Sequence, residues 1–280
     1  MDANDWDQRY AAAELVWSVT PNRFVEEELT ALTAGRAVDL AAGEGRNAIW
    51  LAGRGWDVTA VDFSQVALDK GRRLAADQQL RGTVRWECAD ATAWRAEEEY
   101  DVAVVAYLQL PADQRRAAVR RAFDALRPGG TFLLVAHDST NLAEGTGGPQ
   151  DPAVLMTAED VLADLGDRSF EVVRAGRVPR TVEDGHGEQP ARTAWDCLVR
   201  VVRLGRGAPA GIPGQPGIPS VVSPCNAHPP REEADNPCPE TVRRSGGRGS
   251  PGPRPGPPRR ERPEGHRSHR SRRSHGSQRS

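Results

Sequence analysis

The sequence has few cysteines and no long apolar segment. Four cysteines occur in 280 residues, and none form a pair separated by two residues: Cys88, Cys197, Cys225 and Cys238. This spacing argues against a disulfide framework or a zinc site and favours reduced, buried thiols. No run approaches the ~18 apolar residues that span a bilayer, and the acidic first five residues lack the apolar core of a signal peptide. We therefore expect a soluble, cytoplasmic protein.

The chain is also poor in apolar residues beyond Leu204. Residues 205–280 hold 15 Pro and 12 Gly, and their aliphatic residues hardly cluster outside Val221 and Val222. Such a segment cannot bury enough apolar surface to offset the entropy lost on ordering. We therefore predict an N-terminal helical or lid segment at 1–35, one folded domain at 36–204 and a disordered tail at 205–280.

Basic residues are scarce in the predicted folded part. Residues 1–204 carry 23 basic and 33 acidic side chains, a balance of −10, whereas residues 205–280 carry 14 and 6, a balance of +8. An acidic domain argues against a folded surface for nucleic acid, because neutralising phosphates requires a basic face. We expect a small-molecule partner and no membrane, with any nucleic-acid contact made by the tail. The pattern favours no particular oligomeric state.

Strand-like and helix-like segments alternate along residues 1–204. Strands are expected at 37–40, 57–61, 84–88, 101–108 and 131–136, followed by two late strands at 170–173 and 194–204. Helices are expected at 24–32 and 46–53, after Ser64, from Pro111 to Leu126, and after Thr157. This alternation predicts an α/β fold. We expect a single doubly wound, Rossmann-like, seven-stranded and mostly parallel sheet with helices on both faces.

A glycine turn follows the first predicted strand. Asp39 ends the strand, Gly43 and Gly45 lie in the turn, and a helix begins at residue 46. Glycines let a backbone approach a ligand closely, and unpaired N–H groups at a helix start suit an anionic group. Asp62 and Asp90 follow the next two strands. Three acids are therefore predicted to face one crevice at the carboxyl ends of neighbouring strands.

The turn alone does not identify the ligand. Gly43, Gly45 and Ala48 also satisfy the dinucleotide pattern G-x-G-x-x-G/A, with Asp62 in the position expected for a ribose contact. A carboxylate at Asp39 would repel a doubly negative pyrophosphate but would attract an ammonium or a sulfonium. The residues therefore favour a positively charged ligand, with a nicotinamide-dependent oxidoreductase as the alternative.

With these motifs the chain resembles the class I S-adenosylmethionine-dependent methyltransferases. The resemblance rests on the turn from Asp39 to Gly45, on Asp62, on Ala89-Asp90-Ala91 and on the turn from Leu126 to Gly130. It covers residues 36–137, and further segments near the N-terminus and at 147–150 are similar to bacterial tellurite-resistance methyltransferases. The resemblance implies S-adenosylmethionine as the cofactor. It also implies the cofactor-binding residues Asp39, Ala41, Gly43, Gly45, Asp62, Phe63, Asp90 and Ala91.

The acceptor side is expected at the ends of the fourth and fifth strands. Tyr107 and Gln109 follow the fourth strand, where the transferred methyl lies in this superfamily. His137, Asp138 and Asn141 follow the fifth. His137 could accept a proton with Asp138 orienting it, or could be an ordinary hydrogen-bonded histidine at a strand end. The Asn/Asp-Pro-Pro-aromatic motif of base methylation is absent, which favours a small acceptor.

Two further segments have open roles. Trp6, Tyr10 and Trp17 either close over the site as a lid or pack against the edge of the sheet. His186 lies in an acidic, glycine-rich loop that resembles a substrate-entry loop, and its spacing to other ligands does not favour a metal site. A third hypothesis is a protein that binds the cofactor without turnover and associates with partners through its basic tail.

Overall fold

The computed structural model describes residues 3–12, 20–182 and 192–205. All of them belong to one compact unit, Met1–Gly217, and the second unit, Ile218–Ser280, lies outside the described residues. The predictions for Trp17, for the His186 loop and for the tail beyond residue 205 also lie outside them. Within the described ranges, no helix is both long and apolar enough to cross a membrane.

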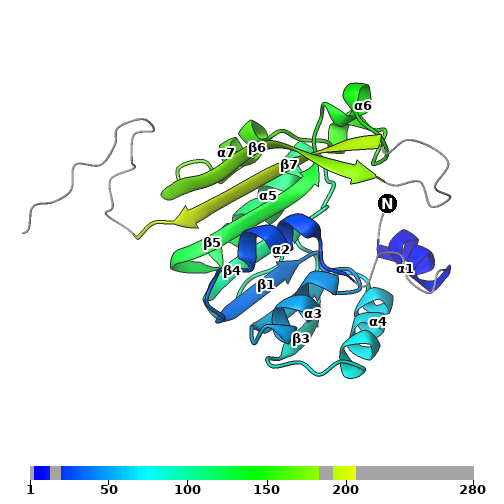
Figure 1. Cartoon of the computed structure of the whole chain (residues 1–280), viewed down its shortest axis with the longest axis vertical. Coiled ribbons are helices and arrows are strands. Elements are labelled where there is room, and N and C mark those ends of the chain that lie inside the picture. The colour runs from blue at the N-terminus through cyan, green and yellow to red at the C-terminus, as the bar shows by residue number, and fades with distance from the viewer. Residues whose placement is uncertain (1–2, 13–19, 183–191, 206–280) are drawn as a thin grey trace, which may run out of the picture. The chain divides into compact units, whose positions relative to one another are not determined.

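The described residues contain one seven-stranded sheet with the order β3-β2-β1-β4-β5-β7-β6 (Figure 1). Strands β1 to β5 run parallel, whereas β7 runs antiparallel to both of its neighbours, β5 and β6. This topology confirms the predicted doubly wound, mostly parallel fold. The strands are β1 (Arg36–Leu40), β2 (Asp57–Asp62), β3 (Val84–Cys88), β4 (Tyr100–Ala106), β5 (Leu126–His137), β6 (Phe170–Val182) and β7 (Arg192–Arg203).

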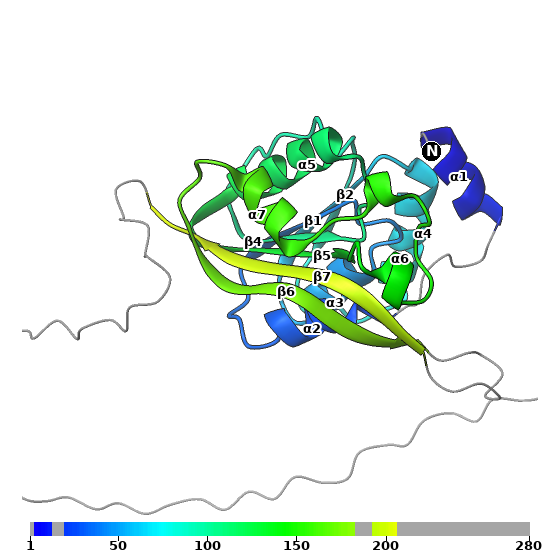
Figure 2. The same cartoon turned by 90° about the horizontal axis from the view of Figure 1, so that it is seen from above.

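Helices cover both faces of the sheet. Figure 2 shows α2 and α3 on one face and α5 and α7 on the other. Helix α4 packs against β2 and β3, and α1 packs against α4. The helices are α1 (Ala3–Ala12), α2 (Arg23–Leu29), α3 (Arg46–Gly53), α4 (Gln65–Ala76), α5 (Ala112–Asp124), α6 (Asn141–Glu144), α7 (Ala158–Leu165) and the short 3-10 helix η1 (Pro152–Val154).

Side-chain caps fix where three of these helices begin. The side-chain oxygen of Asn22 accepts hydrogen bonds from two backbone N–H groups of α2, and that of Ser64 accepts one from Ala67 in α4. Thr157 and Asp160 form the reciprocal capping box predicted for α7. Each cap satisfies N–H groups that a helix start leaves without partners, which contributes about 1 kcal/mol.

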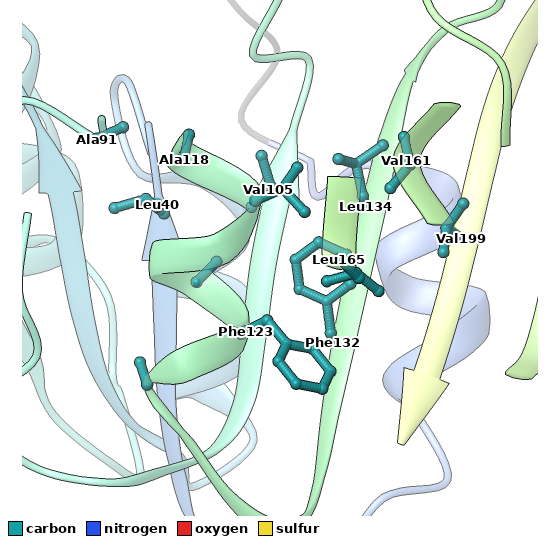
Figure 3. Close-up of a cluster of buried hydrophobic side chains, with 14 of the residues drawn as sticks. Leu40, Ala91, Val105, Ala118, Phe123, Phe132, Leu134, Val161, Leu165 and Val199 are labelled. Carbon is teal, nitrogen blue, oxygen red and sulfur yellow. The ribbon is translucent and has the colours of Figure 1, made fainter. Parts of the chain in front are cut away.

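Two apolar clusters hold the helices on the sheet. The cluster in Figure 3 lies between the sheet and helices α5 and α7, and Phe123, Phe132 and Leu165 are fully buried in it. A second cluster on the opposite face includes Phe24 of α2 and Leu51 of α3. Burying a side chain of this size contributes about 1.5–3 kcal/mol. The carboxyl ends of the parallel strands are therefore held on a rigid scaffold.

The late strands are longer than the sequence predicted. Strand β6 continues from Phe170 to Val182, whereas only residues 170–173 were expected. It is an edge strand, and the part beyond residue 173 carries Arg174, Arg177 and Arg180, whose charges interrupt the apolar pattern of a strand. The predicted turn at residues 127–130 lies inside β5, where the pairing with β4 shifts register.

The cysteine prediction holds for one of the two cysteines within the described residues. Cys197 is buried in β7, as expected, whereas Cys88 at the end of β3 is exposed. The expectation of burial for Cys88 was therefore wrong. The reason is that β3 forms the other edge of the sheet, so less of it is covered than of a central strand.

Candidate active site

The turn between β1 and α3 contains three residues with left-handed backbone. Ala41, Gly43 and Gly45 have φ angles of 64°, 58° and 76°. Glycine adopts this conformation without steric cost, whereas a residue with a Cβ, such as Ala41, is strained by about 1–3 kcal/mol. Strain of this kind persists where the surrounding structure enforces it and is frequent at functional turns. The predicted turn is present, with Ala41 in the position where the resembling family often has glycine.

Gly45 also makes room for Trp86 of β3. A Cβ added to Gly45 would lie 2.4 Å from Cη2 of the Trp86 ring, and one added to Gly71 of α4 would lie 2.4 Å from Cζ3. The indole ring is therefore wedged between the turn and α4. Side-chain packing fixes the shape of this turn as firmly as its backbone angles do.

Asp39 is fully buried, and neither of its carboxylate oxygens has a hydrogen-bond partner. Burial raises the pKa of Asp39 to about 7, while the charge of Arg46 acts in the opposite direction. A buried carboxylate without partners costs several kcal/mol unless a cation or donors meet it. Asp39 is therefore suited to a cationic ligand group that enters next to the turn.

Asp62, the last residue of β2, is hydrogen-bonded to the same turn. Its Oδ2 accepts a hydrogen bond from the N–H of Gly43 at 2.8 Å, and its Oδ1 accepts one from the N–H of Ser64 at 2.9 Å. Burial raises the pKa of Asp62 against these two hydrogen bonds. A carboxylate has about four lone-pair positions, so two remain for ligand hydroxyls.

Helix α1 lies beside this end of β2. The carboxylate of Asp7 in α1 accepts a hydrogen bond from the Ser64 hydroxyl, and its charge contributes to the raised pKa of Asp62. Tyr10, one turn further, is buried. Helix α1 packs on α4, which in turn packs on β2 and the edge strand β3, so the packing role left open by the sequence remains a prediction. The role of α1 as a lid also remains a prediction.

The third predicted acid follows β3. Asp62 is paired with Cys88 in the parallel register of β2 and β3. Asp90 therefore lies at the carboxyl ends of these strands, as Asp62 does. Asp90 is exposed, and its Oδ1 accepts hydrogen bonds from the N–H and the hydroxyl of Thr92. Ala91 is buried, and Phe63, which follows β2, is half-buried. Because β1, β2 and β3 are neighbouring parallel strands, the three predicted acids lie at the same end of the sheet, where these strands finish.

Tyr107 lies on the other side of the point where the strand order reverses, between β1 and β4. It follows β4 directly and has a left-handed φ of 57°. Its hydroxyl donates a hydrogen bond to Oδ2 of Asp196 at 2.8 Å. Burial, together with the charge of Asp196, raises the pKa of the Tyr107 phenol. Tyr107 is therefore a neutral phenol whose hydroxyl hydrogen is already donated to Asp196.

His137, the last residue of β5, is beside the same carboxylate. Its Nδ1 lies 3.4 Å from Oδ1 of Asp196, and its ring centroid lies 5.0 Å from that of Tyr107. Arg180 of β6 completes the group, since its Nε donates to Oδ2 of Asp196 at 2.7 Å. Tyr107, His137, Arg180 and Asp196 are called the Asp196 cluster below.

The other candidates on the acceptor side make hydrogen bonds that hold the backbone around His137. Asp138 was expected to orient His137, but its Oδ1 accepts hydrogen bonds from the N–H and the hydroxyl of Thr140. Asn141 donates to the Gly147 carbonyl at 2.8 Å and therefore holds the loop that passes over His137. Gln109 accepts a hydrogen bond from the His137 N–H at 3.1 Å.

Sequence reasoning missed Asp196 and Arg180. Both lie in the late strands, far along the chain from the residues they contact, and the hydrogen bond from Tyr107 to Asp196 spans 89 positions. One signal was available. Asp196 is a lone acid within an apolar strand, and a carboxylate in such a strand needs partners.

Two other features do not add to the site. A surface hollow lined by Asp124, Arg168 and Arg203 lies at the opposite end of the parallel strands and contains none of the predicted residues. Within the described ranges, no three His, Cys, Asp or Glu side chains are grouped closely enough to hold a metal ion.

Comparison with known sequences places the turn inside a known domain. Residues 37–130 match a family described as a methyltransferase domain. Hemagglutinin 1 of Eikenella corrodens is 31% identical over 119 residues, which cover 42% of this chain and 39% of that protein. Thiocyanate methyltransferase 1 of Brassica oleracea is 24% identical over 186 residues, which cover 66% and 76%. The chain therefore spans well under half of the first of these two relatives.

Comparison with solved structures supports the same fold. TehB from Haemophilus influenzae has a TM-score of 0.54 at 16% identity and covers 65% of this chain and 62% of that one. NodS from Bradyrhizobium japonicum WM9, an N-methyltransferase in complex with S-adenosyl-L-homocysteine, has a TM-score of 0.55 at 16% identity and covers 72% and 99%. At these identities the likeness establishes the fold.

Proposed function

We propose that this chain, whose residues 37–130 match a methyltransferase domain, is a class I S-adenosylmethionine-dependent methyltransferase that transfers the methyl group of its donor to a small-molecule acceptor. The donor binds in the crevice where β1, β2 and β3 end. The acceptor binds beside the ends of β4 and β5. These two halves meet at the point where the strand order reverses, which is where open α/β sheets bind ligands.

The observation that carries the donor assignment is the unpartnered, fully buried carboxylate of Asp39. An ammonium such as that of the methionine part supplies both charge and donors to such a group, and charge-assisted hydrogen bonds are the stronger kind. A pyrophosphate would instead place negative charge beside a second negative group. Asp39 therefore favours S-adenosylmethionine over a nicotinamide dinucleotide.

The residues that follow β2 and β3 fit the nucleoside part of the donor. Asp62 retains two acceptor positions for ribose hydroxyls after its hydrogen bonds to Gly43 and Ser64. Phe63 lies directly after it, and Asp90 and Ala91 follow the neighbouring strand at the same edge. We assign Phe63 to one face of the adenine and Asp90 with Ala91 to its edge.

On the acceptor side, residues of the chain orient the methyl acceptor and accept its proton. When bound, S-adenosylmethionine supplies a methyl group on a positively charged sulfur, already activated for in-line displacement. Aligning the acceptor with it lowers the barrier by up to about 7–11 kcal/mol. Tyr107 helps to shape the site, and His137 accepts the proton of an acceptor that is protonated at neutral pH. The acidic composition of residues 1–204 and the similarity to a thiocyanate methyltransferase both support a small acceptor.

Calorimetric titration tests the donor assignment. S-adenosylhomocysteine is expected to bind the protein, and NAD is expected not to compete with it. In Asp62→Asn the affinity should fall about 10- to 100-fold, because a hydrogen bond to a charged group contributes about 1.5–3 kcal/mol. Asn keeps an oxygen for one of the two backbone N–H groups, so the turn should remain folded.

Asp113→Asn is the matched control, because Asp113 lies in α5 with a 94% exposed side chain. Its affinity for S-adenosylhomocysteine should equal that of the unchanged protein. Equal affinity in Asp62→Asn would remove Asp62 from the donor site, and binding of NAD alone would end the methyltransferase assignment. A screen of thiols, thiopurines, phenols and chalcogen oxyanions with labelled donor then identifies the acceptor.

A further inference from the structure

The Asp196 cluster is built around one fully buried carboxylate. Asp196 is 0% exposed and lies in β7, where its register partner is His137, the last residue of β5. An apolar residue at this position would avoid the cost of removing a carboxylate from water. A buried charge with several specific partners near a ligand site is a candidate for a functional role.

The partners of Asp196 divide between its two oxygens. Oδ2 accepts the hydrogen bonds from the Tyr107 hydroxyl at 2.8 Å and from Nε of Arg180 at 2.7 Å. Oδ1 lies 3.4 Å from Nη2 of Arg180 and 3.4 Å from Nδ1 of His137. Oδ2 is therefore occupied, whereas Oδ1 is the oxygen that faces the imidazole.

Asp196 stays ionised despite its burial. Burial alone would raise its pKa, but the contacts with His137, Arg180 and Tyr107 outweigh that effect and hold the pKa below its usual range. The groups that face His137 are thus a carboxylate from β7, a neutral phenol from β4 and, across the carboxylate, the guanidinium from β6.

The ring of His137 is also held in place from outside the cluster. Its backbone N–H donates to Gln109, and a Cβ on Gly148 would lie 2.9 Å from the Cγ, Nδ1 and Cε1 atoms of the ring. The loop backbone at Gly148 therefore passes close to the imidazole. A ring held in this way presents its Nδ1 edge to Asp196, so its Nε2 is the nitrogen left for another partner.

We propose that Asp196 is the positioning residue for His137: it keeps the neutral imidazole protonated on Nδ1, so that Nε2 is the basic nitrogen that receives the acceptor's proton. This inference rests on the proposed function. In the reaction the bond from sulfur to methyl breaks and its electron pair stays on sulfur. The bond from methyl to the acceptor atom forms, and the acceptor's proton moves to Nε2 and then to water. Asp196 stabilises the imidazolium formed in that step.

The proposal narrows the chemistry of the acceptor. A nucleophile that is already an anion at neutral pH has no proton to give and does not need this arrangement. A methyl acceptor that reacts through a thiol, a phenol or an N–H group has such a proton and does need this arrangement. Arg180 and Tyr107 then serve to keep Asp196 ionised and aligned, so that its second oxygen remains directed at the imidazole.

The tautomer of His137 provides a test that needs no acceptor. Nitrogen NMR of the full chain labelled with ¹⁵N-histidine, recorded at about pH 8.5 where histidine is ordinarily neutral, distinguishes a protonated Nδ1 from a protonated Nε2. The His137→Gln spectrum assigns the signal. We expect the Nδ1–H form in the unchanged protein. In Asp196→Asn the amide can donate to Nδ1, so the proton should move to Nε2.

Asp124→Asn is the matched control, because Asp124 also receives two hydrogen bonds from one arginine, Arg168, but at the opposite end of the parallel strands. It should leave the tautomer unchanged. An Nε2–H form in the unchanged protein overturns the proposal, even if Asp196→Asn does not fold. The same tautomer in Asp196→Asn also overturns it.

Binding of S-adenosylhomocysteine separates this proposal from the proposed function. Asp196→Asn should bind it within about twofold of the unchanged protein, because Asp196 does not contact the donor crevice residues. Once the acceptor screen supplies a substrate, kcat should fall about 10²- to 10⁴-fold while KM changes little, which is the range for general acid–base catalysis. A failure of the unchanged protein to bind S-adenosylhomocysteine would defeat the proposed function but not the tautomer result.

Discussion

Asp39 and Asp196 are fully buried carboxylates whose surroundings shift their pKa values in opposite directions. Asp39 has no hydrogen-bond partner, and burial raises its pKa to about 7. Asp196 accepts hydrogen bonds from Tyr107 and Arg180 and lies 3.4 Å from Nδ1 of His137, and these contacts together hold its pKa low despite burial. The first carboxylate is suited to receive a cation from outside, whereas the second is a charge that the chain itself maintains. Two identical side chains thus take different roles because of what surrounds them.

The raised pKa of Asp39 makes the stability of the ligand-free protein depend on pH. Between about pH 4 and pH 7 the folded chain keeps a proton that the unfolded chain releases, so stability from this group is lost as the pH rises through that window. Asp39→Asn removes the effect. We expect its Tm to exceed that of the unchanged protein by several degrees at pH 8 and to approach it near pH 4, while binding of S-adenosylhomocysteine is lost.

Asp101→Asn is a control of opposite sign. Contacts with Arg36 and Arg127 hold the pKa of Asp101 low against the effect of burial, so its contribution is present above the ordinary aspartate range and is lost in acid. Its Tm should fall at pH 8 and its donor affinity should not change. Thermal unfolding at the two pH values checks both variants. A Tm of Asp39→Asn below that of the unchanged protein at pH 8 would contradict the argument.

At the level of elements, features that depend on local sequence patterns were predicted correctly, whereas contacts between distant parts of the chain were not predicted. The turn after β1, the Ser64 cap of α4 and the Thr157 capping box all depend on residues within a few positions of one another, so the sequence contains the whole signal. The Asp196 cluster is assembled from the ends of β4 and β5 and from β6 and β7, and no local pattern joins them. Strand β6 was predicted too short because its three arginines interrupt the apolar pattern, and the carboxylates that pair with Arg174 and Arg180 lie in other elements.

The wedge formed by Trp86 predicts a sharp contrast between two glycines of one segment. Gly45→Ala places a Cβ 2.4 Å from the Trp86 ring at a φ of +76° and should destabilise the fold by about 2–5 kcal/mol. Gly53→Ala, in the last turn of the same α3, meets nothing within 4 Å and should stabilise it by about 0.5–1 kcal/mol. Urea unfolding measures both. Equal stability in the two variants would show that Trp86 does not constrain the turn.

At the level of the whole molecule, the described residues contain all parts of the proposed function. The sheet, both apolar clusters and both halves of the site come from residues before 205. The predictions for the domain ends, the lid and the tail still stand as predictions, since residues 13–19 and 206–280 are not described.

A chain that ends at Gly217, the boundary of the first compact unit, should therefore keep the function proposed here. We expect its Tm and its affinity for S-adenosylhomocysteine to match those of the full chain. Calorimetry of the two chains side by side checks this. A loss of cooperative unfolding or of binding on truncation would show that residues 218–280 contribute to the folded unit.

The reversal of strand order between β1 and β4 has an evolutionary consequence. The proposed donor contacts come from β1 to β3, whereas the groups proposed around the acceptor come from β4 to β7 and from the loop at Gly148. Tyr107 and Arg180 interact with Arg46 beside the turn, so mutations of the second group away from these two residues should disturb the first group least. Descendants of such a chain could therefore exchange one substrate for another at those outer positions while they keep the same methyl donor.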